Sequence, residues 1–280
     1  MKTVKIAGVP EHFNLPWHLC TENGEFDEVD IDLQWTDVPE GTGKMCQMLR
    51  EGTTDMAVIL TEGIIKDIAA GNDSSIVQIY VQSPLIWGIH VNAKSNFQQL
   101  SDLENRKVAI SRMGSGSHLM AIVNAKNQNW NTDLEFEIVN TIDGAVEALS
   151  KGTADYFMWE RFMTKPLVDN GTFRRIADCP TPWPCFVIAV RNEFLKTNKH
   201  VVDQILEIIN NTTIEFKDIP SIDRTLATKY NQKPEDIQEW LKLTRWSQKK
   251  LDKQTFDKVQ NQLFELNLIT DKLDYESVVK

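Results

Sequence analysis

The chain has 280 residues, of which 41% are hydrophobic and 25% charged, the composition of an ordinary globular protein. Its 30 basic and 40 acidic residues give a net charge of −10, which repels phosphate backbones, so we expect no nucleic-acid partner. No apolar run approaches the roughly 20 residues that cross a bilayer, so we expect no direct membrane insertion.

The N-terminus and the cysteines bear on the cellular compartment. Residues 1–13 lack the apolar core and small-residue cleavage site of a secretory signal, and a predicted strand begins at Val4. No C-x-x-C spacing occurs, so we expect reduced, buried thiols at Cys20, Cys46, Cys179 and Cys185. The sequence therefore predicts a cytoplasmic protein, or a periplasmic one if it is a trimmed mature form.

Two segments 100 positions apart share one pattern. Residues 49–55 read LREGTTD and residues 149–155 read LSKGTAD, and apolar residues and then a glutamate follow each copy. Apolar residues three and four positions apart precede each copy, so each copy is expected to end a helix that leads into a buried strand. Thr42 and Asp143 are the expected helix caps, and the glycine of each copy is expected to end its helix in the left-handed conformation.

Strands and helices alternate along the chain. The predicted strands are residues 4–9, 29–35, 56–60, 107–111, 134–139 and 156–159. After residue 190 the apolar spacing becomes helical, and three helices are expected around residues 202–209, 237–243 and 256–266. This alternation predicts an α/β protein with largely parallel sheets.

Two extended, proline-marked stretches divide the chain. They are residues 83–91 and residues 180–190, the second stiffened by three prolines. If both cross between lobes, residues 1–86 with 187–280 form lobe 1, and residues 87–186 form an inserted lobe 2. Two crossings make a hinge, and the cleft between the lobes is the expected ligand site.

The order and spacing of several short stretches resemble a known family. The matching stretches are residues 43–55, Gly71, residues 103–110 (LENRKVAI), residues 114–118 (GSGSH) and residues 144–155. They resemble the type II solute-binding proteins of ABC transporters, nearest to the nitrate, alkanesulfonate and thiamine-pyrimidine-precursor group. The Trp-Pro-Cys-Phe stretch and the absent signal look like a subgroup known from fungi and some bacteria. The resemblance implies a two-lobe α/β clamshell that closes on a small molecule without a cofactor, with an ABC permease as the partner that the family supplies.

The glycine-serine stretch after the fourth predicted strand is the first candidate site. Backbone N–H groups at such a strand-to-helix turn bind anions or polar groups. The third glycine of a dinucleotide fingerprint and the Gly-Lys-Ser/Thr of a phosphate loop are both absent. Ligands of α/β proteins lie at the carboxyl ends of strands, so we expect contacts from Ser115, Gly116, Ser117 and His118. The alternative is a flexible turn capped by Ser117.

The ends of the two repeat strands are the second candidate site. Thr61 and Glu62 end the first strand, and Trp159 and Glu160 end the second. Their carboxylates can accept N–H bonds from an amine or an aminopyrimidine. The alternative is that each glutamate only begins a helix, where a negative charge is favourable. Thr42 is a further candidate ligand-binding residue.

Several tryptophans are candidates for stacking on a flat ligand. Those at predicted strand ends and joints are Trp17, Trp87, Trp159 and Trp183. Their alternative role is packing in the hinge and core. Those assigned to core or surface are Trp35, Trp130, Trp240 and Trp246.

No catalytic or metal motif is evident. His12 and His18 have no carboxylate or cysteine at the spacing of a zinc site, so no metal ligands are assigned. No nucleophile elbow or catalytic triad appears, and no catalytic residue is assigned. The sequence therefore favours a small-molecule binder, with a nitrogen heterocycle such as a thiamine-pyrimidine precursor as ligand. The alternatives are a cytosolic enzyme on the same fold, of lyase or synthase type in menaquinone or thiamine pathways, and a sensor domain.

Overall fold

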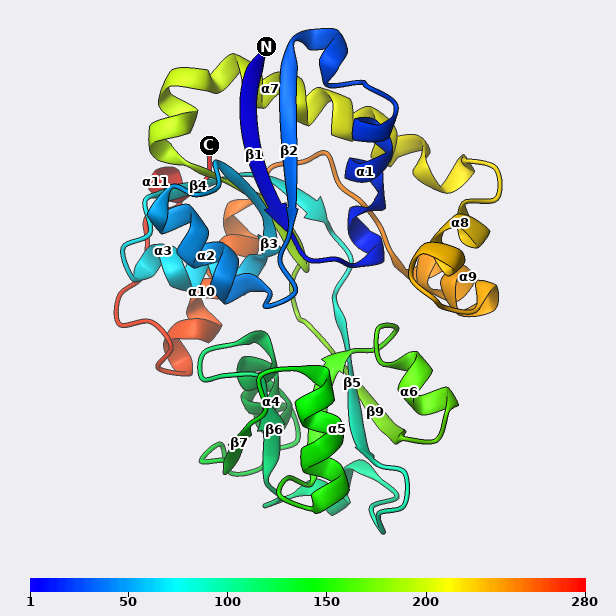
Figure 1. Cartoon of the computed structure of the whole chain (residues 1–280). Coiled ribbons are helices and arrows are strands. Elements are labelled where there is room, and N and C mark those ends of the chain that lie inside the picture. Colours follow the sequence, from blue (N-terminus) through cyan, green and yellow to red (C-terminus); the bar gives the residue numbers. More distant parts are fainter. The chain divides into compact units, whose positions relative to one another are not determined.

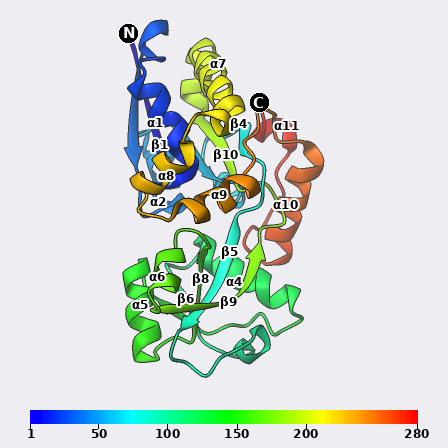
Figure 2. The ribbon, with the colours of Figure 1, turned by 90° about the vertical axis from the view of Figure 1, so that its right-hand side faces the viewer.

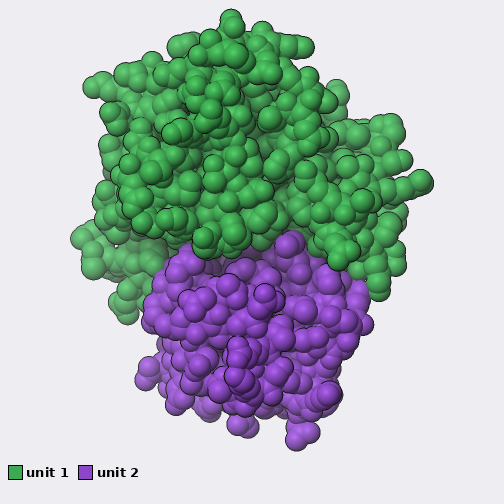
Figure 3. Space-filling model, viewed as in Figure 1, with its two compact units in different colours: residues 1–83, 183–280 green, residues 84–182 purple.

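The computed structural model describes residues 1–280, which divide into two compact units. Unit 1 comprises residues 1–83 and 183–280, and unit 2 comprises residues 84–182 (Figure 3). The chain therefore leaves unit 1 after Ser83 and re-enters it at Trp183. These boundaries come three and four residues earlier than the sequence predicts, because β5 and β10 each begin close after a crossing.

Unit 1 contains one five-stranded sheet and most of the helices (Figure 1). Its strands are β1 (Lys2–Gly8), β2 (Ile31–Asp37), β3 (Met56–Leu60), β4 (Ser74–Val81) and β10 (Phe186–Arg191). Its α-helices are α1 (Leu15–Glu22), α2 (Thr42–Glu51), α3 (Thr61–Ala69), α7 (Asn192–Glu215), α8 (Ile222–Lys229), α9 (Pro234–Leu243), α10 (Lys253–Glu265) and α11 (Tyr275–Val278). None of the helices combines the length and apolar character that a membrane span requires.

Unit 2 is smaller and also contains one five-stranded sheet. Its strands are β5 (Ile86–Asn92), β6 (Val108–Ile110), β7 (Phe136–Ile138), β8 (Tyr156–Glu160) and β9 (Phe173–Pro180). Its α-helices are α4 (Gly116–Asn127), α5 (Ile142–Lys151) and α6 (Lys165–Asp169).

The two sheets have the same topology. Their strand orders are β2-β1-β3-β10-β4 and β7-β6-β8-β5-β9. In each sheet the first three strands are parallel, and the fourth, β10 or β5, is antiparallel to both of its neighbours. The sheets are thus largely parallel, as strand and helix alternation predicts, and the single reversed strand in each is the one that follows a crossing of the chain.

The sequence repeat builds the same local structure in both units. Gly52 and Gly152 end α2 and α5 in the left-handed conformation, with φ values of 69° and 70°. The repeat aspartate then binds the neighbouring strand: Asp55 accepts from the Lys5 amide at 3.0 Å, and Asp155 accepts from the Lys107 amide at 2.9 Å. Each aspartate therefore fixes where the central strand begins beside its parallel neighbour.

Both predicted helix caps are wrong. Gly41 is the N-cap of α2, so Thr42 is the first helical residue and its side chain caps nothing. Thr141 caps α5, because its extended backbone lets the hydroxyl accept from the Gly144 amide at 3.1 Å. Asp143 instead lies in the first turn, where its charge is favourable next to the helix dipole.

The C-terminal segments complete unit 1 and cover the edge of its sheet. Figure 2 shows α8 and α9 as a helical hairpin, and these helices contact each other extensively. Edge strand β4 is paired further by the chain around α10 and α11: Ile79 donates to the Lys249 carbonyl, Gln82 donates to the Arg245 carbonyl, and Lys280 donates to the Ile76 carbonyl. An open edge would invite pairing with another chain, and these segments remove it.

Candidate functional site

The carboxyl ends of β1 and β3 form one part of the site, in unit 1. These strands pair in parallel, so they end at the same edge of the sheet. A single 3-10 turn (His12–Asn14) follows β1, and α3 begins at Thr61, directly after β3. Glu62 is therefore the second residue of α3.

The segment from Trp183 to Phe186 holds the start of α3. The Thr61 amide donates to the Cys185 carbonyl at 3.0 Å, and the Thr61 hydroxyl donates to the Pro184 carbonyl at 2.6 Å. The Trp183 indole N–H donates to Glu62 Oε2 at 2.7 Å. The proline-rich stretch that the sequence marks as a joint therefore also holds the start of α3 in place.

Glu62 is buried without a cation beside it. Only 1% of its surface is exposed, and the loss of hydration raises the pKa of its carboxyl group to about 7, although the bond from Trp183 acts in the opposite direction. Oε1 of Glu62 is buried and has no hydrogen-bond partner. A carboxyl group in this state can accept a bond as the anion or donate one as the acid near neutral pH.

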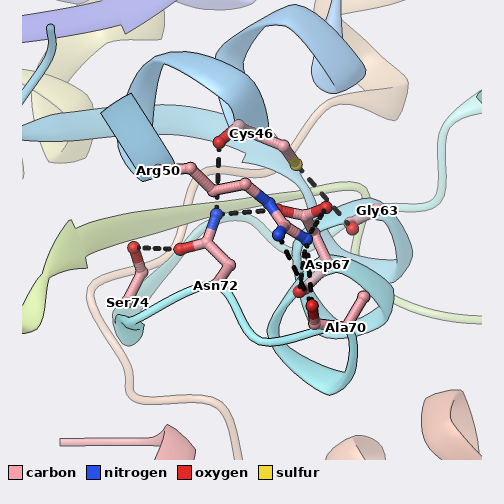
Figure 4. A network of polar contacts seen from close by, with 7 residues as sticks. All are labelled: Cys46, Arg50, Gly63, Asp67, Ala70, Asn72 and Ser74. Carbon is pink, nitrogen blue, oxygen red and sulfur yellow. Dashed lines mark hydrogen bonds and ion pairs between the residues drawn. The ribbon is translucent and has the colours of Figure 1, made fainter. Parts of the chain in front are cut away.

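A polar network pins α3 against α2 (Figure 4). Arg50 binds both carboxylate oxygens of Asp67 at 2.8 Å, and the Asn72 amide donates to Asp67 at 2.7 Å and to the Cys46 carbonyl at 3.2 Å. At the other end of α3, a Cβ on Gly63 would lie 2.2 Å from Cγ2 of Thr42, so the two helices are in close contact there. Thr42 therefore packs against α3 and helps to place Glu62.

The turn after β1 is held equally firmly. The Phe13 carbonyl accepts from the Tyr80 hydroxyl at 2.8 Å and from the Trp246 indole at 3.3 Å. The Phe13 ring contacts Phe186 at a centroid distance of 5.2 Å, and Phe186 pairs with Leu60 at the end of β3. This chain of contacts joins the turn to the start of α3 within one edge of the sheet.

His12 is a buried polar residue in the turn after β1 whose surroundings the sequence did not reveal. It is fully buried, it stacks on Trp240 at 4.2 Å with an interplanar angle of 19°, and neither ring nitrogen has a partner. Burial lowers the pKa of His12 to about 3, so the imidazole is neutral at physiological pH. The indole nitrogen of Trp240 and Oδ1 of Asn14 are also buried and unpartnered. Only the position of His12 after a strand could have drawn attention to it, since nothing local indicates its contact with α9.

Unit 2 has a comparable group at the end of β8. Glu160 is directly opposite Trp87 on β5, and the Met163 amide donates to Oε2 of Glu160 at 2.6 Å. The Trp87 and Trp159 rings meet edge to face at 6.4 Å, and the indole nitrogen of Trp87 is buried without a partner. Glu160 and Trp87 thus lie together in one polar and aromatic cluster.

The glycine-serine stretch opens α4 as predicted. Ser115 is the N-cap and accepts from the His118 amide at 3.3 Å. The Ser117 hydroxyl accepts from the Ser111 amide at 2.9 Å and lies 3.0 Å from the Ser115 hydroxyl, so both hydroxyls have partners inside the turn. His118 Nδ1 accepts from the Gly114 amide at 3.0 Å. The first amides of α4, at Gly116 and Ser117, are therefore the groups that such a helix offers to a ligand.

Two of the candidate tryptophans pack against other aromatic rings of their units, Trp17 fully buried and Trp159 partly buried. Trp17 is fully buried between Phe26, Trp35 and Tyr80, at centroid distances of 6.3, 5.9 and 6.0 Å. Trp159 stacks on Phe157 at 5.4 Å and packs against the hydrophobic core of unit 2. These contacts agree with packing, the alternative to ligand stacking that the sequence analysis gives for these tryptophans.

The structure contains no group of three or more histidine, cysteine, aspartate or glutamate side chains that could hold a metal ion. His18 contacts the Trp35 ring at 5.3 Å, whereas His12 faces α9. All four cysteines are free and buried.

Comparisons with known proteins agree with this architecture. The model of the Ca3427-like PBP (periplasmic binding protein) family matches residues 87–179. The solved structure of the Candida albicans CA3427 gene product, described as having the generic periplasmic binding protein fold, is 25% identical. It aligns over 100% of this chain and 96% of its own, with a TM-score of 0.92. No curated protein matches this chain.

The chain has the type II periplasmic-binding-protein fold. Two sulfonate-binding proteins share that fold at lower identity. The periplasmic aliphatic sulphonate binding protein SsuA of Escherichia coli is 17% identical over 100% of this chain and 92% of its own, with a TM-score of 0.79. The alkanesulfonate-binding protein SsuA of Xanthomonas axonopodis pv. citri, bound to MOPS, is 16% identical over 100% and 98%, with a TM-score of 0.83. In this periplasmic-binding-protein fold the two repeats lead into β3 and β8, the equivalent central strands of the two units.

Proposed function

We propose that the protein binds one small organic molecule and that the carboxyl end of β3 in unit 1 contributes to its recognition. The observation that carries the proposal is Glu62, a buried carboxyl group with one oxygen held by Trp183 and the other unpartnered at the end of β3. Buried polar atoms without partners are rare in folded proteins, and a ligand is one of the groups that satisfies them. The periplasmic-binding-protein fold and the solute-binding relatives support the same function.

The ligand that suits these groups is neutral or cationic and carries N–H donors, such as a nitrogen heterocycle. In unit 1, Glu62 is an acceptor when ionised and Trp183 lies beside it. In unit 2, Glu160 is opposite Trp87. An inorganic anion or a sulfonate would place negative charge beside these carboxyl groups, which is unfavourable at low dielectric. We therefore expect the ligand of this chain to differ in charge from the sulfonates that the two relatives bind.

Calorimetry on matched variants tests the proposal. The ligands are 4-aminopyrimidine, a primary alkylamine and ethanesulfonate, and the variants are Glu62→Gln, Glu160→Gln and the exposed control Glu147→Gln. Loss of a buried charge-assisted bond amounts to about 1.5–3 kcal/mol, so each buried variant should bind the heterocycle about tenfold or more weakly while the control is unchanged. Tight sulfonate binding that is indifferent to both glutamates would contradict the proposal, and turnover of the heterocycle would favour an enzyme.

A further inference from the structure

Unit 1 contains a cavity of about 350 Å³ beside the first part of α7, and it shares no residue with the candidate site. Four apolar residues line it: Val77 of β4 and Leu195, Val202 and Leu206 of α7. α7 follows β10, and the last residues of β10 lie opposite the start of β3, with Val190 opposite Met56. α7 therefore begins at the edge of the sheet opposite to the one where Glu62 follows β3.

Two irregularities of the backbone border the cavity. The pairing of β4 with β10 skips Val77, because Ala189 pairs with Ile76 and the preceding residue of β10 pairs with Gln78. α7 is kinked at Asn198, whose φ of −130° and ψ of 29° are not helical. An extra strand residue and a helix kink each change how neighbouring elements pack, and the cavity lies where the two meet.

The rim of the cavity is basic, although the whole chain carries a net charge of −10. Four lysines and one acidic residue are among the lining residues: Lys196, Lys199, Lys250, Lys280 and Asp203. Lys199 is paired with Asp203 at 2.7 Å, and the Lys280 ammonium donates to the Glu276 carbonyl. Lys196 and Lys250 are exposed and have no ion pair. Two cations without counter-ions thus border an apolar wall.

We propose that this cavity is a second binding site and that its ligand is a single-chain anionic amphiphile, such as a medium-chain carboxylate. The inference goes beyond the proposed function and does not depend on it, because the cavity and the candidate site lie at different places in unit 1.

The chemistry of the lining selects such a ligand. A hydrocarbon chain leaves water when it lies against Val77, Val202 and Leu206, and the lysine stems extend this apolar surface while their ammonium groups stay hydrated. A carboxylate at the rim is attracted to Lys196 and Lys250, whereas a cation is repelled. The volume is at the lower end of the roughly 300–1,000 Å³ of small-molecule pockets, so a small molecule fits it better than a protein segment does.

Calorimetry on the full chain with three probes tests the inference. Octanoate has both the chain and the negative charge, acetate has the charge alone, and octylammonium has the same chain with the opposite charge. We expect wild type to bind octanoate at least about tenfold more tightly than either of the other two, and its affinity for octanoate to fall as salt is added. Equal binding of octanoate and octylammonium, or no binding of octanoate, would overturn the inference.

Variants locate the site. Lys196→Gln combined with Lys250→Gln should weaken octanoate binding about fivefold or more, since each exposed ion pair contributes modestly. The control combines Lys242→Gln with Lys258→Gln, which removes two exposed lysines outside the cavity and should bind octanoate like wild type. Equal affinities of the two double variants would contradict the inference.

Two further variants separate this cavity from other places where octanoate could bind. Leu206→Trp fills the cavity and should abolish octanoate binding at an unchanged melting temperature, and retained binding in this folded variant would overturn the inference. If Leu206→Trp does not fold, the lysine variants decide. Glu62→Gln should leave octanoate affinity unchanged, whereas a change would assign octanoate to the end of β3. The proposed function can therefore fail in its own heterocycle test while this inference stands, and the reverse.

Discussion

At the scale of single residues, Glu62 is a polar group whose burial is unfavourable for stability. Glu62 begins a helix, and the sequence could identify it because it directly follows an apolar strand. What the sequence could not show is that Trp183, far along the chain, holds one carboxylate oxygen while burial leaves the other unpaired. The position after a strand identifies Glu62 as a candidate, but its burial and its hydrogen bond are visible only in the tertiary structure.

The raised pKa of Glu62 predicts a specific pH dependence of stability. Its ordinary value is 4.5 and its value in the folded protein is about 7, so between these two pH values the unfolded chain releases the proton first. The contribution of Glu62 to the free energy of unfolding therefore falls as pH rises from about 4.5 to about 7 and stays low above that range. Glu62→Gln lacks this fall, while its amide oxygen can still accept from Trp183.

Denaturant unfolding of wild type and Glu62→Gln at pH 5 and pH 8 measures this effect. We expect the variant to gain stability relative to wild type between these pH values, by on the order of 2–3 kcal/mol. The exposed control Glu147→Gln should show no such gain. An unchanged gap between wild type and Glu62→Gln would show that the carboxyl group titrates normally in the folded protein.

His12 marks the limit of sequence reasoning at the residue scale. Two histidines near one loop suggested a metal, and the lack of a ligand pattern dismissed the pair. In the structure His12 instead stacks on Trp240 of α9. No local periodicity connects a turn near the N-terminus with a helix near the C-terminus, so this contact could only come from the tertiary structure.

At the scale of elements, apolar runs predict strands well and caps poorly. The predicted strand 56–60 coincides with β3, because all five of its residues are apolar and pack between two neighbours. The predicted strand 4–9 differs from β1 (Lys2–Gly8) because pairing with β2 begins at Lys2, an exposed residue that the apolar pattern does not register. Caps failed because they depend on the backbone angles of one residue, which Thr141 has and Asp143 does not.

The repeat predicts that its two aspartates have equal structural roles. Asp55 and Asp155 each accept a backbone N–H from the parallel neighbouring strand. Substitution by alanine leaves that amide without its acceptor and should cost about 1–3 kcal/mol of unfolding free energy in either copy. Substitution by asparagine keeps an acceptor oxygen and should cost much less.

Urea unfolding of Asp55→Ala, Asp155→Ala and the two asparagine variants measures these differences. Comparable losses for the two alanine variants, with recovery in both asparagine variants, would support equivalent roles. Alanine and asparagine variants of equal stability would show that the bond to the neighbouring strand contributes nothing, and that the repeated aspartate has another origin.

At the scale of the whole molecule, the sequence predicted two α/β units from one repeated heptapeptide. The prediction succeeded because the helix, the left-handed glycine and the aspartate form a local unit that each sheet needs once beside its central strand. The packing of the C-terminal helices could not be read in the same way. The apolar faces of these helices predict that they are buried. They do not predict that Trp240 on α9 contacts His12 in the turn after β1.

The central proposal is that this protein selects a neutral or cationic, N–H-bearing small molecule and leaves it chemically unchanged. Native mass spectrometry of the full chain with equal concentrations of 4-aminopyrimidine and ethanesulfonate tests it directly. We predict one heterocycle per chain, no sulfonate adduct, and recovery of the heterocycle at its original mass after prolonged incubation. A chain that takes up the sulfonate in preference, or that returns the heterocycle as a different compound, would contradict the account.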